Sequence, residues 1–169
     1  MDTVDMIGLR IIHIVAGVFW VGGFLFLTFI LIPRLRALGP AVQGPVMGSV
    51  MKLAVPAFLS AAGLLMASGV WMALKLRWGV LDSFFNDAWG WAILVGAVLT
   101  VLAVLMGLLV TRPAMLGAAA IGASLQGSPP TSEQGAQLGA LQKRMSRASH
   151  TTSALLVAAV ICMAVARWI

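Results

Sequence analysis

Four apolar stretches dominate this sequence, and each is long enough to cross a lipid bilayer as a helix. They cover residues 7–33, 53–74, 89–110 and 151–166. A helix needs about 20 residues to cross the ~30 Å hydrocarbon core of a bilayer. The chain is 61% hydrophobic and 9% charged, whereas a soluble domain is roughly half apolar and one-quarter charged. The sequence therefore predicts an all-α fold, an integral membrane four-helix bundle that forms a single transmembrane domain over residues 1–169.

Basic residues gather on one side of the predicted membrane. With four spans, both termini share one side, and the connections after the first and third spans lie on the other. That other side carries Arg34, Arg36, Lys52, Arg112, Lys143, Arg144 and Arg147 against the single acid Glu133. The positive-inside rule places it in the cytoplasm. We therefore expect a multi-pass protein of the bacterial cytoplasmic (inner) membrane with both termini outside.

The same basic excess does not indicate a nucleic-acid partner. Binding nucleic acid requires basic residues on a soluble face, interleaved with aromatic residues that stack on bases, and the sequence contains no such segment. The basic residues are better explained as determinants of topology and as contacts with anionic lipid. Membrane lipid is therefore the expected partner, together with other membrane subunits or a second copy of the chain.

Both connections on the basic side carry predictions of their own. Between Pro33 and Lys52, prolines and glycines indicate a loop that leads into the second helix. The segment 112–150 begins with an apolar stretch and breaks at 127–130. After the break, Thr131 to Gln134 fits a capping box, and the helix that it starts is expected to run into the fourth span. The sequence thus predicts helical extensions on the cytoplasmic side.

Tryptophans gather near the opposite side, which holds the termini. They are Trp71, Trp78, Trp89, Trp91 and Trp168, and such a group is typical of an aromatic belt at a membrane interface. The connection 76–88 mixes apolar and acidic residues and is expected to lie along the membrane surface. Trp20 is the one tryptophan predicted at membrane depth.

The candidate functional site lies in the first span. At 3.6 residues per turn, His13, Gly17 and Trp20 fall on one helix face, with Gly23 at its border. An imidazole at this point can bind haem iron through a ring nitrogen, and the glycines let a flat macrocycle approach the backbone. The spacing equally allows a histidine that is hydrogen-bonded between two helices over a stripe of small residues. Ionisable groups inside a membrane are rare and usually functional, which favours a ligand role.

Further ligands are less clearly indicated. His150 lies near the opposite membrane face, on the order of 20 Å from His13 along the helix axis, so one iron cannot hold both. It is expected to be an interfacial residue at the start of the fourth span. The candidates for a sixth ligand near His13 are Met66, Met72, Cys162 and Met163, each of which packing alone also explains.

The first span resembles a superfamily of small bacterial membrane proteins that includes the copper-resistance-D-type proteins and the HemJ-type protoporphyrinogen oxidases. The resemblance rests on a histidine, a tryptophan seven residues later and then glycines, here His13, Trp20, Gly22 and Gly23. The chain end, 163–168, is similar to the closing helix of copper-resistance-D-type members. For HemJ-type proteins the resemblance implies a b-type haem ligated by His13. Those oxidases also carry a lysine in a later span, which the third span of this chain lacks.

Three functions follow as hypotheses. The leading one is a haem-b-binding membrane protein in electron transfer or porphyrin handling, with His13 as axial ligand and Gly17, Trp20 and Gly23 lining the macrocycle site. The second is copper handling across the membrane, because thioethers are suitable copper ligands and the chain has ten methionines. The third is a cofactor-free structural subunit of a larger membrane complex. Whether the protein is an enzyme, as a protoporphyrinogen oxidase would be, is left open by the missing lysine.

Overall fold

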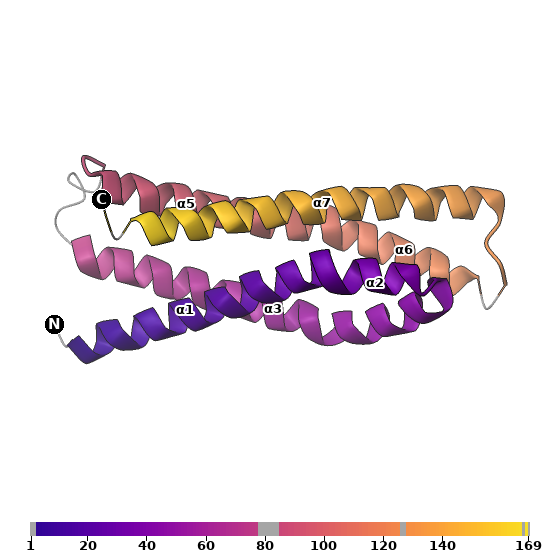
Figure 1. Ribbon diagram of the computed structural model, residues 1–169, viewed down its shortest axis with the longest axis horizontal. Helices are drawn as coiled ribbons and strands as arrows, with labels where there is room; N and C mark the ends of the chain where they lie inside the picture. Colours follow the sequence, from indigo (N-terminus) through magenta and orange to yellow (C-terminus); the bar gives the residue numbers. More distant parts are fainter. Residues whose placement is uncertain (1–2, 78–84, 126–127, 167, 169) are drawn as a thin grey trace. The chain divides into compact units, whose positions relative to one another are not determined.

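The computed structural model of this chain describes residues 3–77, 85–125, 128–166 and 168. Every regular element within these ranges is a helix (Figure 1). Four continuous helical segments are long and apolar enough to cross a membrane: Val4–Ala37, Ala41–Lys75, Ala88–Ser124 and Ser132–Val165. The predicted all-α class with four membrane-spanning helices is confirmed. The chain is a multi-pass membrane protein in contact with lipid.

The first span contains a local change of helix type. It consists of α1 (Thr3–Phe26), the π-helical turn η1 (Leu27–Leu31) and α2 (Ile32–Ala37). The N–H of Ile32 bonds to the carbonyl of Leu27, five residues earlier. Pro33 has no N–H and its ring would clash with the carbonyl four residues before it. The wider π turn makes room for this ring, so the helix continues through the proline.

The third span repeats this arrangement. It consists of α5 (Ala88–Met106), the π turn η2 (Gly107–Thr111) and α6 (Arg112–Ser124). The N–H of Arg112 bonds to the carbonyl of Gly107, and Pro113 is the next residue. The same physical reason applies, because the proline ring again follows the π turn.

The loop predicted between Pro33 and Lys52 is wrong. Helix α2 ends at Ala37, and α3 (Pro40–Arg77) begins after only two residues. Gly39 makes this short connection possible because its φ of +85° lies in the left-handed region, which glycine adopts without steric cost. A proline at the first position of a helix is favourable, so Pro40 starts α3 rather than preventing it.

The capping box at the start of the fourth helix is confirmed. The N–H of Gln134 donates to Thr131 Oγ1 at 3.2 Å, and the N–H of Thr131 donates to Gln134 Oε1 at 3.0 Å. Helix α7 (Ser132–Val165) then runs without interruption into the apolar span, as predicted.

The helices are longer than a bilayer requires. Helix α3 has 38 residues and α7 has 34, which makes each more than about 50 Å long, against a hydrocarbon core of ~30 Å. The additional turns belong to the segments 34–52 and 111–150, outside the apolar stretches. This confirms that helical extensions continue the spans.

By their contacts, the residues of the chain form two compact units. One comprises residues 1–94 and 164–169, and the other comprises residues 95–163. In the first, α1 and α2 pack antiparallel against α3; in the second, α6 and the part of α5 from residue 95 onward pack antiparallel against α7 (Figure 1). Each unit is therefore built around a helical hairpin.

Small residues occupy most of the buried positions in the described part of the chain. Ala103, Ala114 and Ala148 are each at most 2% exposed, whereas Val18 and Leu53 are at least 70% exposed. This pattern is the reverse of a soluble protein, because lipid rather than water surrounds the outer apolar side chains. Small residues let the helix backbones approach closely, which is how membrane helices associate.

The connection 76–88, expected to lie along the membrane surface, has its residues 78–84, with Trp78, outside the described residues. At its end, Trp91 donates its indole N–H to the carbonyl of Phe85 at 2.8 Å. Trp71 and Trp91 are more than half exposed and Trp168 is 82% exposed. Trp20, in contrast, is buried.

Candidate functional site

His13 lies in the N-terminal half of the first span and is hydrogen-bonded to the second. Its Nδ1 atom is 2.9 Å from the carbonyl oxygen of Leu65 and 3.2 Å from Ser68 Oγ, both on α3. The Ser68 hydroxyl is itself 2.6 Å from the carbonyl oxygen of Leu64 and 3.1 Å from that of Leu65. A polar cluster of imidazole, hydroxyl and carbonyl groups therefore joins α1 to α3 within the apolar span.

These contacts fix the tautomer of the imidazole. A carbonyl oxygen can only accept a hydrogen bond, so Nδ1 of His13 must carry the proton and donate it. In the neutral ring this leaves a lone pair on Nε2. Within the described part of the chain, no hydrogen bond to Nε2 is formed. A histidine whose Nδ1–H donates to a backbone carbonyl while Nε2 stays available has the arrangement of a metal-ligating histidine.

Gly69 provides the space for the His13 ring on α3. A Cβ atom at this position would lie 2.9 Å from Cε1 and 3.3 Å from Nδ1 of His13. The imidazole is a rigid ring held by its hydrogen bonds, so it cannot easily give way. Gly69 is thus required by the close approach of the two helices at this level.

His13, Gly17 and Gly23 face α3, and the space over the two glycines is filled. A Cβ atom at Gly17 would lie 3.2 Å from Cδ1 of Leu65, and one at Gly23 would lie 2.9 Å from the ring of Phe58. Trp20 is 6% exposed and Ala16 is 7% exposed. His13, Gly17, Trp20 and Gly23 therefore share one helix face, as the spacing predicted. A macrocycle could lie over the two glycines only if the Leu65 and Phe58 side chains moved.

Aromatic rings pack in the α1–α3 interface near Gly23. The ring of Phe58 on α3 lies with its centroid 5.9 Å from that of Phe19 in an edge-on arrangement. It lies 6.4 Å from the ring of Phe24. Phe58 therefore inserts between two aromatic residues of α1 and packs directly over Gly23.

The sixth-ligand candidates are divided between the two units. Met72 follows Gly69 by three residues, which places it on the face of α3 that His13 contacts, one turn further along. Met66 precedes Gly69 by three residues, so the same spacing places it on this face, one turn in the other direction. Cys162 and Met163 pack against Gly96 of α5 in the other unit, with Met163 Cε 2.9 Å from the place of a Cβ atom.

His150 belongs to α7 in the unit of residues 95–163, whereas His13 belongs to the other unit. The side chain of His150 is exposed, and its Nδ1–H donates to the carbonyl of Ser146, one turn earlier, at 2.7 Å. The interfacial position of His150 stays a prediction. The expectation that His13 and His150 do not share an iron stays a prediction.

Among the described residues, no group of three or more His, Cys, Asp or Glu side chains is placed to hold a metal ion. A ligand set for copper would therefore depend on methionine thioethers. Met47 and Met51 are one turn apart in α3. Copper binding stays a hypothesis without a defined site.

Three participants on α3 were not identified from the sequence. The Leu65 carbonyl is a backbone group and leaves no sequence signal. Ser68 could have been found, because a polar side chain in an apolar span seeks a partner on a neighbouring helix. Gly69 is one of several small residues in the second span, and only the contact with His13 distinguishes it from the others.

Comparisons of this chain with models of protein families, with curated proteins and with solved structures return no match. The resemblance to the copper-resistance-D-type and HemJ-type superfamily therefore stays a prediction from the motif of the first span.

Proposed function

We propose that this protein is a haem-b-binding membrane protein that acts in electron transfer or porphyrin handling, with His13 as an axial ligand. The observation that supports the proposal is the hydrogen bonding of the two nitrogen atoms of the His13 ring. Its Nδ1–H is held by Leu65 and Ser68, and the Nε2 lone pair has no hydrogen-bond partner in the described chain. An unsatisfied polar atom at membrane depth is costly unless it binds something.

The residues fit axial ligation better than they fit a complete haem pocket. The hydrogen bond to Leu65 orients the imidazole and increases its basicity, as the outer partners of metal-bound histidines do. A b-type haem would supply an iron centre that accepts and releases single electrons. Gly17, Trp20 and Gly23 would line its site after Leu65 and Phe58 had turned aside. The absence of a lysine in the third span gives no support to protoporphyrinogen oxidation.

The proposal includes a place and an orientation in the cell. The basic residues near the α2–α3 and α6–α7 connections face the cytoplasm by the positive-inside rule. Both termini then lie outside the bacterial inner membrane. The exposed apolar faces contact lipid and offer surfaces for another membrane subunit or a second copy.

A second candidate is a structural subunit without a cofactor, and the packing of the α1–α3 hairpin favours it. Leu65 and Phe58 already fill the space over Gly17 and Gly23. The hydrogen bond from His13 to Leu65 would then serve only to hold two helices together. In this case the functional conformation is the one in which Leu65 and Phe58 pack over the glycines.

An absorption spectrum of the purified protein separates these candidates. Haem binding predicts a Soret band that is lost in His13→Ala and kept in Ser68→Ala, which removes a hydroxyl but no ligand. A folded wild type that stays colourless after reconstitution with haem would overturn the proposal. A Soret band that persists in His13→Ala would overturn the role of His13. Metal analysis of the same sample tests copper, which requires stoichiometric copper without iron.

A further inference from the structure

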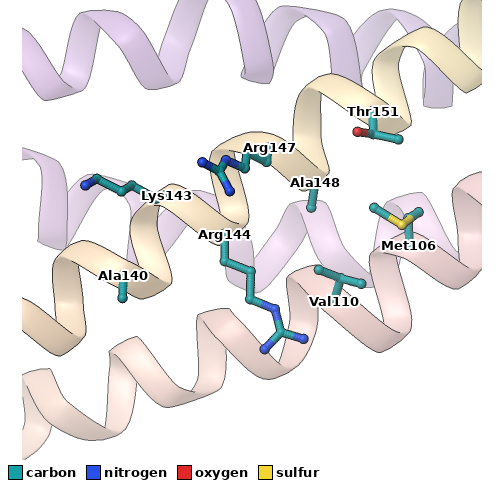
Figure 2. Close-up of a pocket in the computed structure, with 8 residues that line it drawn as sticks. All are labelled: Met106, Val110, Ala140, Lys143, Arg144, Arg147, Ala148 and Thr151. Carbon is teal, nitrogen blue, oxygen red and sulfur yellow. The ribbon is translucent and has the colours of Figure 1, made fainter.

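A groove with basic residues along it lies in the hairpin of α5, η2, α6 and α7, far along the sequence from His13. It has a volume of about 410 Å³ and is open to the outside, which is within the range of small-molecule sites. It is lined by Met106, Val110, Ala140, Lys143, Arg144, Arg147, Ala148 and Thr151 (Figure 2). All of these residues belong to one unit.

Three cations of α7 line this groove without a neutralising partner. Lys143 and Arg147 are one turn apart, and Arg144 and Arg147 are three residues apart, so like charges are neighbours on the helix surface. None of the three makes an ion pair in the described part of the chain. Glu133 is the only acidic residue after Asp87. It lies about 15 Å before Lys143 along α7 and accepts a hydrogen bond from Gln137 at 3.4 Å.

The other part of the groove is apolar. Met106 and Val110 line it from the end of α5 and from η2, and Ala148 lines it from α7. Figure 2 shows Ala148 and Val110 pointing toward one another, and Arg144 extending from α7 toward the ribbon that carries Val110. Ala148 is 2% exposed, and its small side chain keeps the two helices close at the base of the groove. The groove therefore combines cationic and apolar walls.

This change of polarity falls at the membrane boundary that the apolar stretches predict. The apolar part of α7 begins at about residue 151, directly after the basic turns 143–147. An anionic phospholipid has its phosphate at the same boundary and its acyl chains below it. Guanidinium groups bind phosphate through two parallel hydrogen bonds, and basic pockets between membrane helices are suited to anionic headgroups. The positive charge of the groove suits the phosphate of one such lipid, and its apolar wall suits the acyl chain.

We propose that this groove is a binding site for one anionic phospholipid, with the phosphate bound by Arg144 and, after their side chains turn toward it, by Arg147 and Lys143, and with the first part of an acyl chain lying on Met106, Val110 and Ala148. The site is independent of the haem proposal, since it shares no residue with it. It gives the protein a preference for anionic over zwitterionic lipid at one defined place.

Native mass spectrometry of the full-length protein tests the site. The protein is equilibrated in mixed micelles that contain equal amounts of phosphatidylglycerol and phosphatidylcholine, and the retained lipid is counted. We expect one phosphatidylglycerol to be retained in preference. The double variant Arg144→Gln/Arg147→Gln should weaken this retention by roughly tenfold or more. Thr151→Leu should also weaken it, because it fills the groove from an exposed position without changing charge.

A matched control removes two cations elsewhere. Arg34 and Arg36 lie on α2 in the other unit, and Arg34→Gln/Arg36→Gln should leave the retained lipid unchanged. An equal loss in this control, or equal retention of the two lipids by the wild type, would overturn the site. A competition experiment with inorganic phosphate tests whether the groove binds phosphate alone. If phosphate displaces the lipid and Thr151→Leu has no effect, the groove binds free phosphate and the lipid proposal is wrong.

Discussion

The Nδ1 atom of His13 and the carbonyl oxygen of Leu65 are joined by a hydrogen bond of 2.9 Å that links the first two membrane-spanning helices. Gly69 makes this bond possible, because any side chain there would meet the imidazole. Ser68 lies beside both and contributes its hydroxyl. The ligand role proposed for His13 and the packing of α1 on α3 therefore depend on the same few atoms, and they can be separated by substitution.

Removing the interhelical hydrogen bond should destabilise the protein modestly. His13→Leu is expected to lower the free energy of unfolding by about 0.6–2 kcal/mol, the range for polar contacts between membrane helices. His13→Gln retains a donor and should cost less. Unfolding by a denaturing detergent, followed by circular dichroism, measures both. A His13→Leu variant as stable as the wild type would show that the bond contributes nothing.

Adding a methyl group at Gly69 should disturb the His13 ring. In Gly69→Ala the new Cβ atom would lie 2.9 Å from Cε1 of His13, and overpacking of this kind costs about 1–3 kcal/mol. Gly63→Ala is the matched control on the same helix, since nothing lies within 4 Å of the Cβ position there. It should be neutral or stabilising by up to about 1 kcal/mol, because alanine favours helix over glycine. Thermal unfolding of the two variants in one detergent compares them, and equal stabilities would contradict the contact.

Two adjacent glycines of α1 should respond differently to the same change. Gly23→Ala would bring a Cβ atom 2.9 Å from the Phe58 ring, whereas at Gly22 nothing lies within 4 Å. We expect Gly23→Ala to cost about 1–3 kcal/mol and Gly22→Ala to be tolerated. If haem binding displaces Phe58, the cost at Gly23 should decrease in the haem-loaded protein. Equilibrium unfolding with and without haem measures this difference; two variants of equal stability would disprove the packing of Phe58 over Gly23.

Loss of the capping box should loosen the start of α7. Thr131→Ala removes the hydroxyl that accepts from the Gln134 N–H and should cost about 1 kcal/mol. Amide hydrogen exchange of Gln134 should accelerate about fivefold to tenfold, which is the same energy expressed as a rate. Ser132→Ala, one residue further on, removes a hydroxyl that takes no part in the box and is the control. Unchanged exchange at Gln134 in Thr131→Ala would mean that the box does not hold the helix end.

Much of the fold follows from local pattern. The four spans can be predicted because a helix that crosses a bilayer needs a long apolar stretch. The start of α7 can be predicted because Thr131 and Gln134, three residues apart, form reciprocal hydrogen bonds. The connection near Gly39 does not follow from the pattern, because prolines and glycines are also typical of longer loops. Pro40 starts a helix instead, and π turns before Pro33 and Pro113 absorb the strain that those prolines would otherwise cause. A π turn depends on which carbonyl oxygen accepts the hydrogen bond from each backbone N–H. The pattern of side chains along the sequence does not predict this.

By itself, the sequence determined that the chain lies in a membrane, that it has four helical spans, and that His13, Gly17, Trp20 and Gly23 share one helix face. Helical periodicity and the thickness of a bilayer are sufficient for these conclusions. Only the tertiary structure decided what that face meets: the Leu65 carbonyl and Ser68 at His13, Gly69 beneath the ring, and Leu65 and Phe58 over the glycines. The reason is that each of these contacts joins residues more than thirty positions apart. Their pairing depends on the register of α1 against α3, and close packing across the interface sets that register.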